Sequence, residues 1–368
     1  MIKVLFLTNI PSPYRVCFFN ALGRLCELTV VFELKSASNR VVGWQEFSAT
    51  TYSEIYLNGK QTAVDAAKCR NAKKYLTDNY DIIVLGGYAT PTQQIAIKYL
   101  HKKKIPFILN SDGAFIPEKE SVIKKWYKKF LIGKADAWIT SGQNSVRQLE
   151  YYGANRERIF VYPFSSVGID DIASELPAKE RSALREELGI HEKKIIITVG
   201  AFIERKGIAT LLKAAKSLID DDIGVYIIGG EPNAEYLDLV GQNSKIHFMK
   251  HLQKADLTKY YKASDLFVLP TREDIWGLVV NEAMAVGLPV ITTNKCNAGL
   301  ELVKDGINGY LIDVDDVNAL TDRIRRVIFN DEKLSAMSRY NLDLIKDYTY
   351  TKMAERHLEI FNVWRDNV

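Results

Sequence analysis

The residues best suited to chemistry lie in the segment TREDIWGLVVNEAMAVGLPVI, residues 271–291. Gly277 stands there between a predicted strand and an apolar helix. A glycine at such a turn lets backbone N–H groups approach an anion, and the helix N-terminus adds partial positive charge. The flanking carboxylates of Glu273, Asp274 and Glu282 would repel phosphate, but they can accept charge-assisted hydrogen bonds from hydroxyls. The segment therefore predicts a site for a phosphate that carries sugar or ribose hydroxyls.

A second group of charged residues lies in the segment GAFIERKG, residues 200–207. It follows the apolar run KIIITV, so Arg205 and Lys206 come at the carboxyl end of a predicted strand. Cations at that edge of a sheet fit a pyrophosphate and can stabilise a leaving group.

The elements that must position these side chains follow a regular pattern. Short apolar runs alternate with amphipathic segments along the chain, which is typical of buried parallel strands joined by helices. This alternation predicts an α/β fold with doubly wound parallel sheets. The predicted strands are 2–10, 27–34, 81–87, 106–110 and 137–142, followed by 194–200, 224–230, 245–249, 265–270, 288–293 and 309–313.

The pattern pauses over residues 162–177, where prolines bracket a polar stretch. A chain of 368 residues also exceeds one ordinary domain. We therefore expect two facing Rossmann-like domains, residues 1–165 and 166–348, and a C-terminal helix within 349–368 that crosses back to the first domain. Ligands bind at the carboxyl ends of such sheets, so a cleft between the two domains is predicted.

Composition excludes several classes of protein. The net charge of +4 gives no global field for nucleic acid, so no nucleic-acid partner is expected. The four cysteines and five histidines show no metal-ligand spacing, which predicts a reducing compartment and no metal or other cofactor. No apolar run approaches the roughly 20 residues that span a bilayer, and no signal peptide is recognisable. We expect a cytoplasmic chain, either soluble or peripheral on a membrane.

Residues 119–134, KESVIKKWYKKFLIGK, are locally basic. Apolar residues recur there at helical spacing with lysines between them: Val122, Ile123, Trp126, Phe130 and Leu131. The segment fits an interfacial helix that meets anionic lipid. It also fits a core-facing stripe beneath a solvated lysine face.

The second half of the chain resembles the nucleotide-binding domain of glycosyltransferase family 4, a large family of retaining enzymes with the GT-B fold. The resemblance covers about residues 195–320. Its motifs, in order, are Lys206-Gly207, Gly229-Gly230, residues 257–291, and the segment ELVKDGINGYLI with its leading Glu301. The family pattern has two acidic residues separated by seven others, which match Asp274 and Glu282.

The resemblance implies a role for each matching residue. Asp274 would hold hydroxyls of the donor sugar, Glu282 would bind the nucleotide ribose, and Lys206 would neutralise the diphosphate. The other implied donor-site positions are Gly200, Arg205, Glu273, the backbone of Ile275, Trp276, Gly277, Leu278 and Val279, and the base-contacting loop with His251 and Leu252.

The sequence departs from the family pattern at three places. Asp274 stands where glutamate is usual, and Ala201 stands where arginine is frequent, so Arg205 is a candidate replacement. The usual histidine of the first domain is absent, and the segment Asn110-Ser111-Asp112-Gly113 takes its place. Asp112 is a candidate for binding a donor or acceptor hydroxyl at the reaction centre, but it cannot act as a cation.

The first loop, NIPSPYRVCFFNAL, resembles a subgroup with a Pro-Tyr-Arg sequence after the first strand. Tyr14 and Arg15 are therefore candidates for binding the acceptor or a phosphate. The alternative is that the prolines shape a turn and the Tyr14 ring only packs.

The resemblance implies transfer of a sugar from a UDP or GDP sugar to a hydroxyl, with retention at the anomeric carbon. The implied acceptor is a saccharide on a lipid carrier, as in bacterial surface-polysaccharide synthesis. With no clear carboxylate nucleophile, we expect a front-face displacement. The alternatives are a nucleotide-sugar hydrolase or epimerase, a protein glycosyltransferase, and a non-catalytic two-domain sugar-binding protein.

Overall fold

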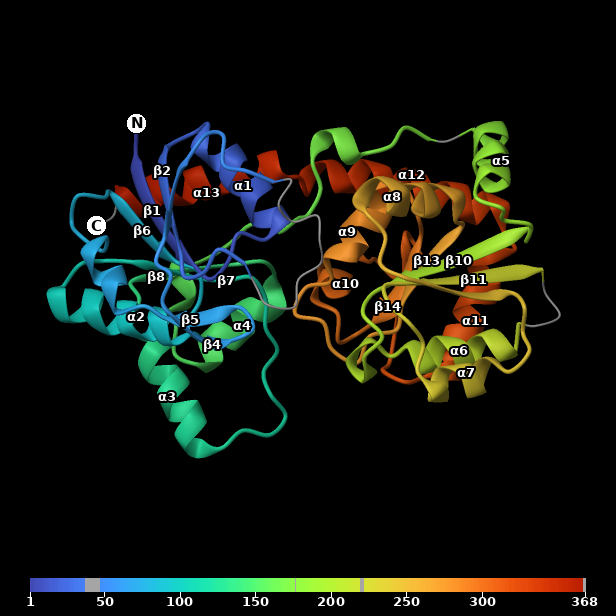
Figure 1. The fold of residues 1–368 in the computed structure, drawn as a ribbon, viewed down its shortest axis with the longest axis horizontal. Coiled ribbons are helices and arrows are strands. Elements are labelled where there is room, and N and C mark those ends of the chain that lie inside the picture. Colours follow the sequence, from blue (N-terminus) through green and yellow to red (C-terminus); the bar gives the residue numbers. More distant parts are fainter. Residues whose placement is uncertain (37–46, 176, 219–221, 367–368) are drawn as a thin grey trace. The chain divides into compact units, whose positions relative to one another are not determined.

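The computed structural model describes residues 1–36, 47–175, 177–218 and 222–366. The chain divides into two compact units (Figure 1): residues 1–165 together with 349–368, and residues 166–348. Each unit is built on a parallel sheet with helices packed against it. The predicted class, two Rossmann-like α/β domains, is confirmed.

The first unit contains a sheet of seven parallel strands in the order β3-β2-β1-β6-β7-β8-β9. Sequence reasoning missed β3, β9 and the small antiparallel pair β4–β5, because these strands are short and carry no long apolar run. The strands are β1 Lys3–Thr8, β2 Glu27–Phe32, β3 Ser53–Tyr56, β4 Lys60–Ala63, β5 Ala66–Lys68, β6 Ile82–Leu85, β7 Ile108–Ser111, β8 Ala137–Thr140 and β9 Ile159–Val161.

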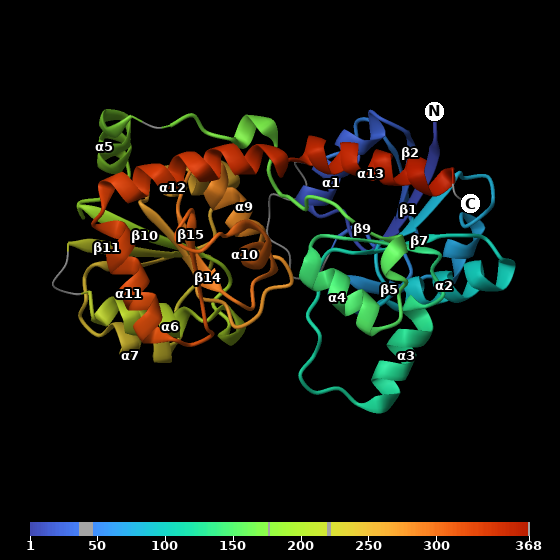
Figure 2. The ribbon, with the colours of Figure 1, turned by 180° about the vertical axis from the view of Figure 1, so that it is seen from behind.

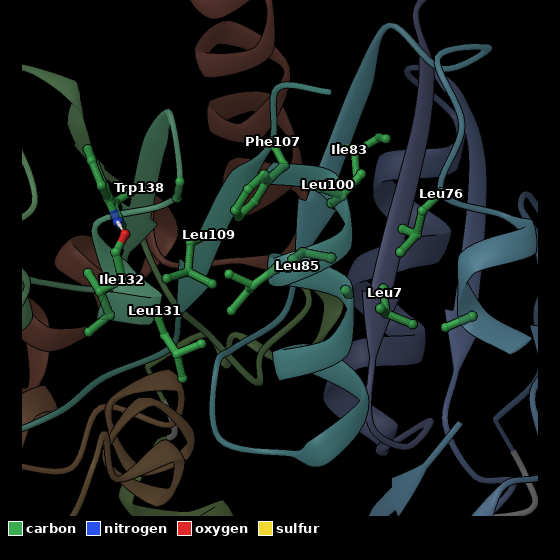
Figure 3. Close-up of a cluster of buried hydrophobic side chains, with 14 of the residues drawn as sticks. Leu7, Leu76, Ile83, Leu85, Leu100, Phe107, Leu109, Leu131, Ile132 and Trp138 are labelled. Atoms are coloured by element: carbon green, nitrogen blue, oxygen red, sulfur yellow. Dashed lines mark hydrogen bonds between the residues drawn. The ribbon is translucent and has the colours of Figure 1, made fainter. Parts of the chain in front are cut away.

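A continuous apolar core lies between this sheet and its helices (Figure 3). The buried indole of Trp138 donates a hydrogen bond of 3.0 Å to the carbonyl of Ile132, which ties the end of α3 to β8. The C-terminal helix α13 packs against α1 in the same unit (Figure 2). The helices are α1 Pro13–Gly23, α2 Pro91–Lys103, α3 Val122–Ile132, α4 Gln143–Tyr151 and α13 Tyr350–Arg365.

The second unit contains six parallel strands in the order β12-β11-β10-β13-β14-β15. The chain builds outward from β10 in one direction and then restarts at β13 in the other. Such a reversal opens a crevice at the carboxyl ends of the two central strands. The strands are β10 Lys194–Val199, β11 Ile223–Ile228, β12 Ile246–Met249, β13 Leu266–Leu269, β14 Val290–Thr293 and β15 Gly309–Ile312.

Eight α-helices accompany this sheet within the described residues. Two of them frame the crevice: α6, which follows β10, and α9, which follows β13. The eight helices are α5 Ala178–Glu187, α6 Ile208–Lys216, α7 Ala234–Val240, α8 Lys254–Ala263, α9 Leu278–Ala285, α10 Asn297–Leu302, α11 Val317–Ile328 and α12 Asp331–Leu344.

The apolar stripe of α3 does not face the core. Val122, Ile123 and Trp126 are 82%, 79% and 63% exposed, whereas Leu131 is buried. The interpretation of a core-facing stripe is therefore wrong for the first two turns of the helix. Among the described residues, no helix combines the length and apolar character needed to cross a bilayer.

Candidate functional site

A charged pair marks the crevice of the second unit. Lys206 ends a short 3-10 turn after β10, and Asp274 lies in the loop after β13. The Nζ of Lys206 donates to Oδ2 of Asp274 at 2.5 Å, and the two side chains are only 15% and 13% exposed. Arg205 lies at the edge of the pair, with Nη1 at 3.9 Å from Oδ1 of Asp274 and at 2.6 Å from the carbonyl of Glu273.

Two glycines let the loops approach this closely. Gly207 has φ 65°, and a Cβ there would lie 1.9 Å from the carbonyl oxygen of Pro270 at the end of β13. Gly277 has φ 98°, and a Cβ there would lie 2.8 Å from Sγ of Cys296. Both values fall in the left-handed region that favours glycine, so any side chain would push the loops apart.

Side-chain and backbone hydrogen bonds fix the loop before α9. The N–H of Asp274 donates to the carbonyl of Lys295 at 2.8 Å, and Nδ2 of Asn297 donates to the carbonyl of Ile275 at 2.7 Å. The indole of Trp276 is buried and donates to Asn281 at 2.8 Å. Trp276 therefore faces the protein interior, and it can offer a ligand only its backbone. The Ile275 side chain, 54% exposed, lies at the surface of the loop.

The first turn of α9 lies directly beyond Gly277 and contains Leu278 and Val279. The leading N–H groups of any helix have no acceptor within the helix, and they carry its partial positive charge. The turn can therefore bind an anion beside Lys206.

Glu282 lies one turn further along α9. Its carboxylate accepts hydrogen bonds from Ser166, at 3.2 Å, and from Tyr261, at 3.4 Å. Burial raises the pKa of Glu282 to about 7, although the two hydroxyl donors and the charge of Lys254 oppose that rise. Sequence reasoning missed Ser166 and Tyr261 as partners, because no local pattern connects them to Glu282.

The remaining predicted donor-site residues lie at the same edge of the sheet. Gly200 follows β10, and the stem of Lys206 passes 3.5 Å from the point where a Cβ would be. His251 and Leu252 follow β12, the edge strand, in the loop before α8. The His251 side chain is exposed, and that of Leu252 is half-buried.

The first unit gathers its own predicted residues into one polar cluster. Arg15, in α1, forms an ion pair with Asp112, which follows β7. Asp112 also accepts hydrogen bonds of 2.8 Å from Tyr162 and from Asn110. Burial alone would lower the pKa of Arg15, but the Asp112 carboxylate together with Tyr14 and Tyr162 outweighs burial and holds the pKa above its ordinary value. Two residues predicted for separate roles therefore form one largely buried pair.

Tyr14 lies beside this cluster. Its ring packs edge-on against Phe164, with centroids 5.5 Å apart. Burial raises the pKa of the phenol, so its hydroxyl stays protonated and can donate. The packing expected in the alternative interpretation is thus present, and it does not remove the hydroxyl as a donor.

The described residues offer no obvious metal site. No group of three or more His, Cys, Asp and Glu side chains among them is arranged to hold a metal ion. The four cysteines are free thiols, and Cys296 is buried beneath Gly277.

Comparisons with known proteins indicate a relationship to glycosyltransferases. The family model described as "Glycosyl transferases group 1" matches residues 180–343. Spore coat protein SA of Bacillus subtilis is 30% identical over 198 residues, covering 50% of this chain and 52% of that protein. The D-inositol 3-phosphate glycosyltransferase of Corynebacterium urealyticum is 29% identical over 249 residues, covering 63% and 57%. The chain thus spans little more than half the length of these curated relatives.

Solved structures match over nearly the whole chain. A glycosyltransferase from Rickettsia africae superposes with a TM-score of 0.77 at 18% identity, covering 100% of this chain and 99% of that one. Anabaena HepE in complex with UDP and glucose gives a TM-score of 0.77 at 16% identity, covering 98% and 100%. The chain therefore has the GT-B fold, and its residues 180–343 resemble the glycosyl transferases group 1.

Proposed function

We propose that this chain is a retaining glycosyltransferase that moves a sugar from a nucleoside-diphosphate sugar, of UDP or GDP type, to a saccharide hydroxyl. The observation that carries the proposal is the shielded pair of Lys206 and Asp274 beside the Gly277 turn. It places a cation for diphosphate next to a carboxylate for hydroxyls. The binding of UDP and glucose by the structurally similar HepE supports this choice of ligand.

Donor binding exchanges one anionic partner of Lys206 for another. The diphosphate takes the ammonium group from Asp274 and accepts hydrogen bonds from the first turn of α9. Asp274, released from Lys206, then accepts hydrogen bonds from hydroxyls of the donor sugar. Glu282 accepts those of the ribose, and the loop with His251 and Leu252 contacts the base.

The transfer step follows from this arrangement. The acceptor oxygen attacks the anomeric carbon on the face from which the diphosphate departs, as the bond from that carbon to the phosphate oxygen breaks. The bonding electrons leave with the diphosphate, and one of its oxygens takes the acceptor proton. Lys206 and the N-terminus of α9 stabilise the charge that develops on the leaving group. Attack on the departing face retains the anomeric configuration without a carboxylate nucleophile.

We assign the acceptor to the polar cluster of the first unit. Because Asp112 already neutralises Arg15, the cluster suits neutral saccharide hydroxyls better than a phosphate. Arg15 and Tyr14 would donate to the acceptor, and Asp112 would accept from it. The proposed acceptor is a lipid-linked saccharide at a membrane surface, which the exposed apolar face of α3 supports.

Replacing Lys206 with alanine should abolish most turnover. Loss of a cation that acts on the leaving group is expected to lower kcat by about 10²–10³, or about 3–4 kcal/mol. Lys216→Ala, an exposed lysine at the end of α6, is the matched control and should keep full activity. A folded Lys206→Ala enzyme that turns over as fast as this control would refute the assignment.

Replacing Asp274 with asparagine should strengthen the binding of the bare nucleotide and weaken sugar transfer, whereas most site variants would lose both. Asparagine cannot neutralise Lys206, so bare UDP or GDP should bind more tightly, by roughly tenfold or about 1.4 kcal/mol. Sugar transfer should fall, because the charge-assisted contact with the sugar hydroxyls is lost. Titration calorimetry against Asp238→Asn, which removes an exposed carboxylate on α7 away from the site, provides the comparison. Equal affinities in the two variants would show that Asp274 does not compete with the diphosphate.

Donor affinity should rise with pH around neutrality. Because the pKa of Glu282 in the free protein is about 7, its carboxyl is largely protonated at pH 6 and largely ionised at pH 8. The ionised form accepts charge-assisted hydrogen bonds from hydroxyls on both of its oxygens, which the protonated form cannot do, so a nucleotide sugar should bind more tightly at pH 8 than at pH 6. The sugar-linked diphosphate does not titrate in this range. Glu282→Gln should flatten the profile, and an equally steep rise in that variant would exclude Glu282 as its source.

Donor consumption should require an acceptor but no divalent metal. With a panel of UDP and GDP sugars, the active donor should be consumed quickly only when a saccharide acceptor is present. Rapid consumption without acceptor would instead indicate a hydrolase or epimerase. We expect full activity in EDTA, because Lys206 and the helix N-terminus supply the positive charge. Activity that is lost in EDTA and restored by magnesium or manganese would overturn that expectation.

A further inference from the structure

Helix α3 presents an unusual surface. Val122, Trp126 and Phe130 recur every four residues and therefore line one face of the helix, with Ile123 beside them. Phe130 is 38% exposed, and its ring stacks on that of Trp126 with centroids 5.6 Å apart. We call these four residues the α3 apolar face. Contiguous exposed apolar residues of this size are typical of interaction surfaces.

The other side of the helix is anchored to its own unit. Leu131 and Ile132 are buried in the core, and the side chain of Ser121 caps the first turn. Two lysines of the helix also make contacts within the unit. Lys128 pairs with Glu120 at 2.6 Å, and Lys125 lies 3.9 Å from the centroid of the Tyr151 ring. These contacts hold α3 in a fixed orientation, and the helix projects from the unit in Figures 1 and 2.

The remaining lysines of the helix are directed to solvent. Lys124 and Lys129 are exposed, and within the described part of the chain neither forms an ion pair with a carboxylate. Lys129 follows Val122 by seven residues and so lies on the side of the apolar face, whereas Lys124, two residues after Val122, lies on the opposite side. Residues 119–134 hold six lysines and one glutamate, a formal charge of +5. Exposed aromatic and aliphatic side chains bordered by an unpaired cation, in a basic segment, match the chemistry of an anionic lipid surface.

We propose that the α3 apolar face docks on an anionic phospholipid bilayer, with Val122, Ile123 and Trp126 entering the interface and Lys129 facing the lipid phosphates. This inference deepens the proposed function, because it gives the site for a lipid-linked acceptor. The proposal does not assign the attraction for lipid to every lysine of residues 119–134. Lys125 and Lys128 hold the helix in place and do not contact lipid.

Vesicle sedimentation with the full chain tests the proposal. The parent should bind vesicles of phosphatidylglycerol mixed equally with phosphatidylcholine, and should bind pure phosphatidylcholine far more weakly. The variant Lys129→Gln should bind the anionic vesicles roughly fivefold more weakly. Lys102→Gln, an exposed lysine on α2 of the same unit, removes the same charge and should bind like the parent.

A second variant isolates the apolar contact. Ile123→Ser with Trp126→Ser changes only exposed side chains, so its melting temperature should stay near that of the parent. It should lose the fraction of binding that persists in 1 M salt, where the Debye length is about 3 Å. Anionic-vesicle binding that is equal in the α2 and α3 lysine variants would overturn the proposal. The proposal would also be overturned if the parent did not bind vesicles but formed a dimer that the Ile123 and Trp126 changes dissociate. The face would then bind a second copy of the chain.

The vesicle assay contains neither donor nor acceptor. Failure to bind vesicles would leave the proposed transfer reaction intact, and failure of transfer would leave the docking surface intact. Activity of the α3 variants toward a soluble saccharide acceptor should equal that of the parent, since none of the changed residues lies in the site.

Discussion

The charge on Lys206 is the constraint on which the second unit depends. An ammonium group that is 15% exposed needs a partner, because burying an unpaired charge is costly. Asp274 supplies that partner before any ligand arrives, and the pair joins the loops after β10 and β13. A shielded ion pair contributes little net stability, because desolvation offsets much of the attraction. In the proposed function, the pair keeps Lys206 in a fixed position until the diphosphate replaces Asp274.

The backbone around the pair explains how two loops from separate strands can share one position. Gly207 passes so close to the carbonyl of Pro270 that no side chain fits, and Gly277 does the same against Cys296. The loop that joins β13 to α9 is tied to Lys295, just before α10, and to Asn297, at the start of α10. Preorganised dipoles and charges stabilise a developing charge without a reorganisation cost at the moment of reaction. These contacts therefore fix the loops at the place where the proposed mechanism develops charge.

The sequence predicted the α/β class, the strands that contain long apolar runs, and the grouping of Lys206, Asp274 and Glu282 at one sheet edge. These follow from local patterns, since parallel strands bring their following loops to a common edge. The side-chain pairs that form between residues far apart in the chain could not be predicted from the sequence. Asp112 and Arg15 are 97 residues apart, and Ser166 and Glu282 are 116 residues apart. Only the folded chain shows that Arg15 is already neutralised, or that Glu282 is buried enough to hold a proton near neutral pH.

The two interpretations of residues 119–134 likewise could not be separated by the sequence alone. Helical spacing predicts an apolar stripe, but it cannot say whether the stripe faces the core or the solvent. Two features settle the orientation of α3: Leu131 and Ile132 enter the core at the last turn, and Lys128 binds Glu120 on the adjoining side. Once that side is fixed by packing, the face with Val122 and Trp126 must point outward. Lys125 and Lys128 then make structural contacts within the unit, whereas Lys129, on the side of the apolar face, has no carboxylate partner among the described residues. The pairing of each lysine, more than the number of lysines, decides what the helix can bind.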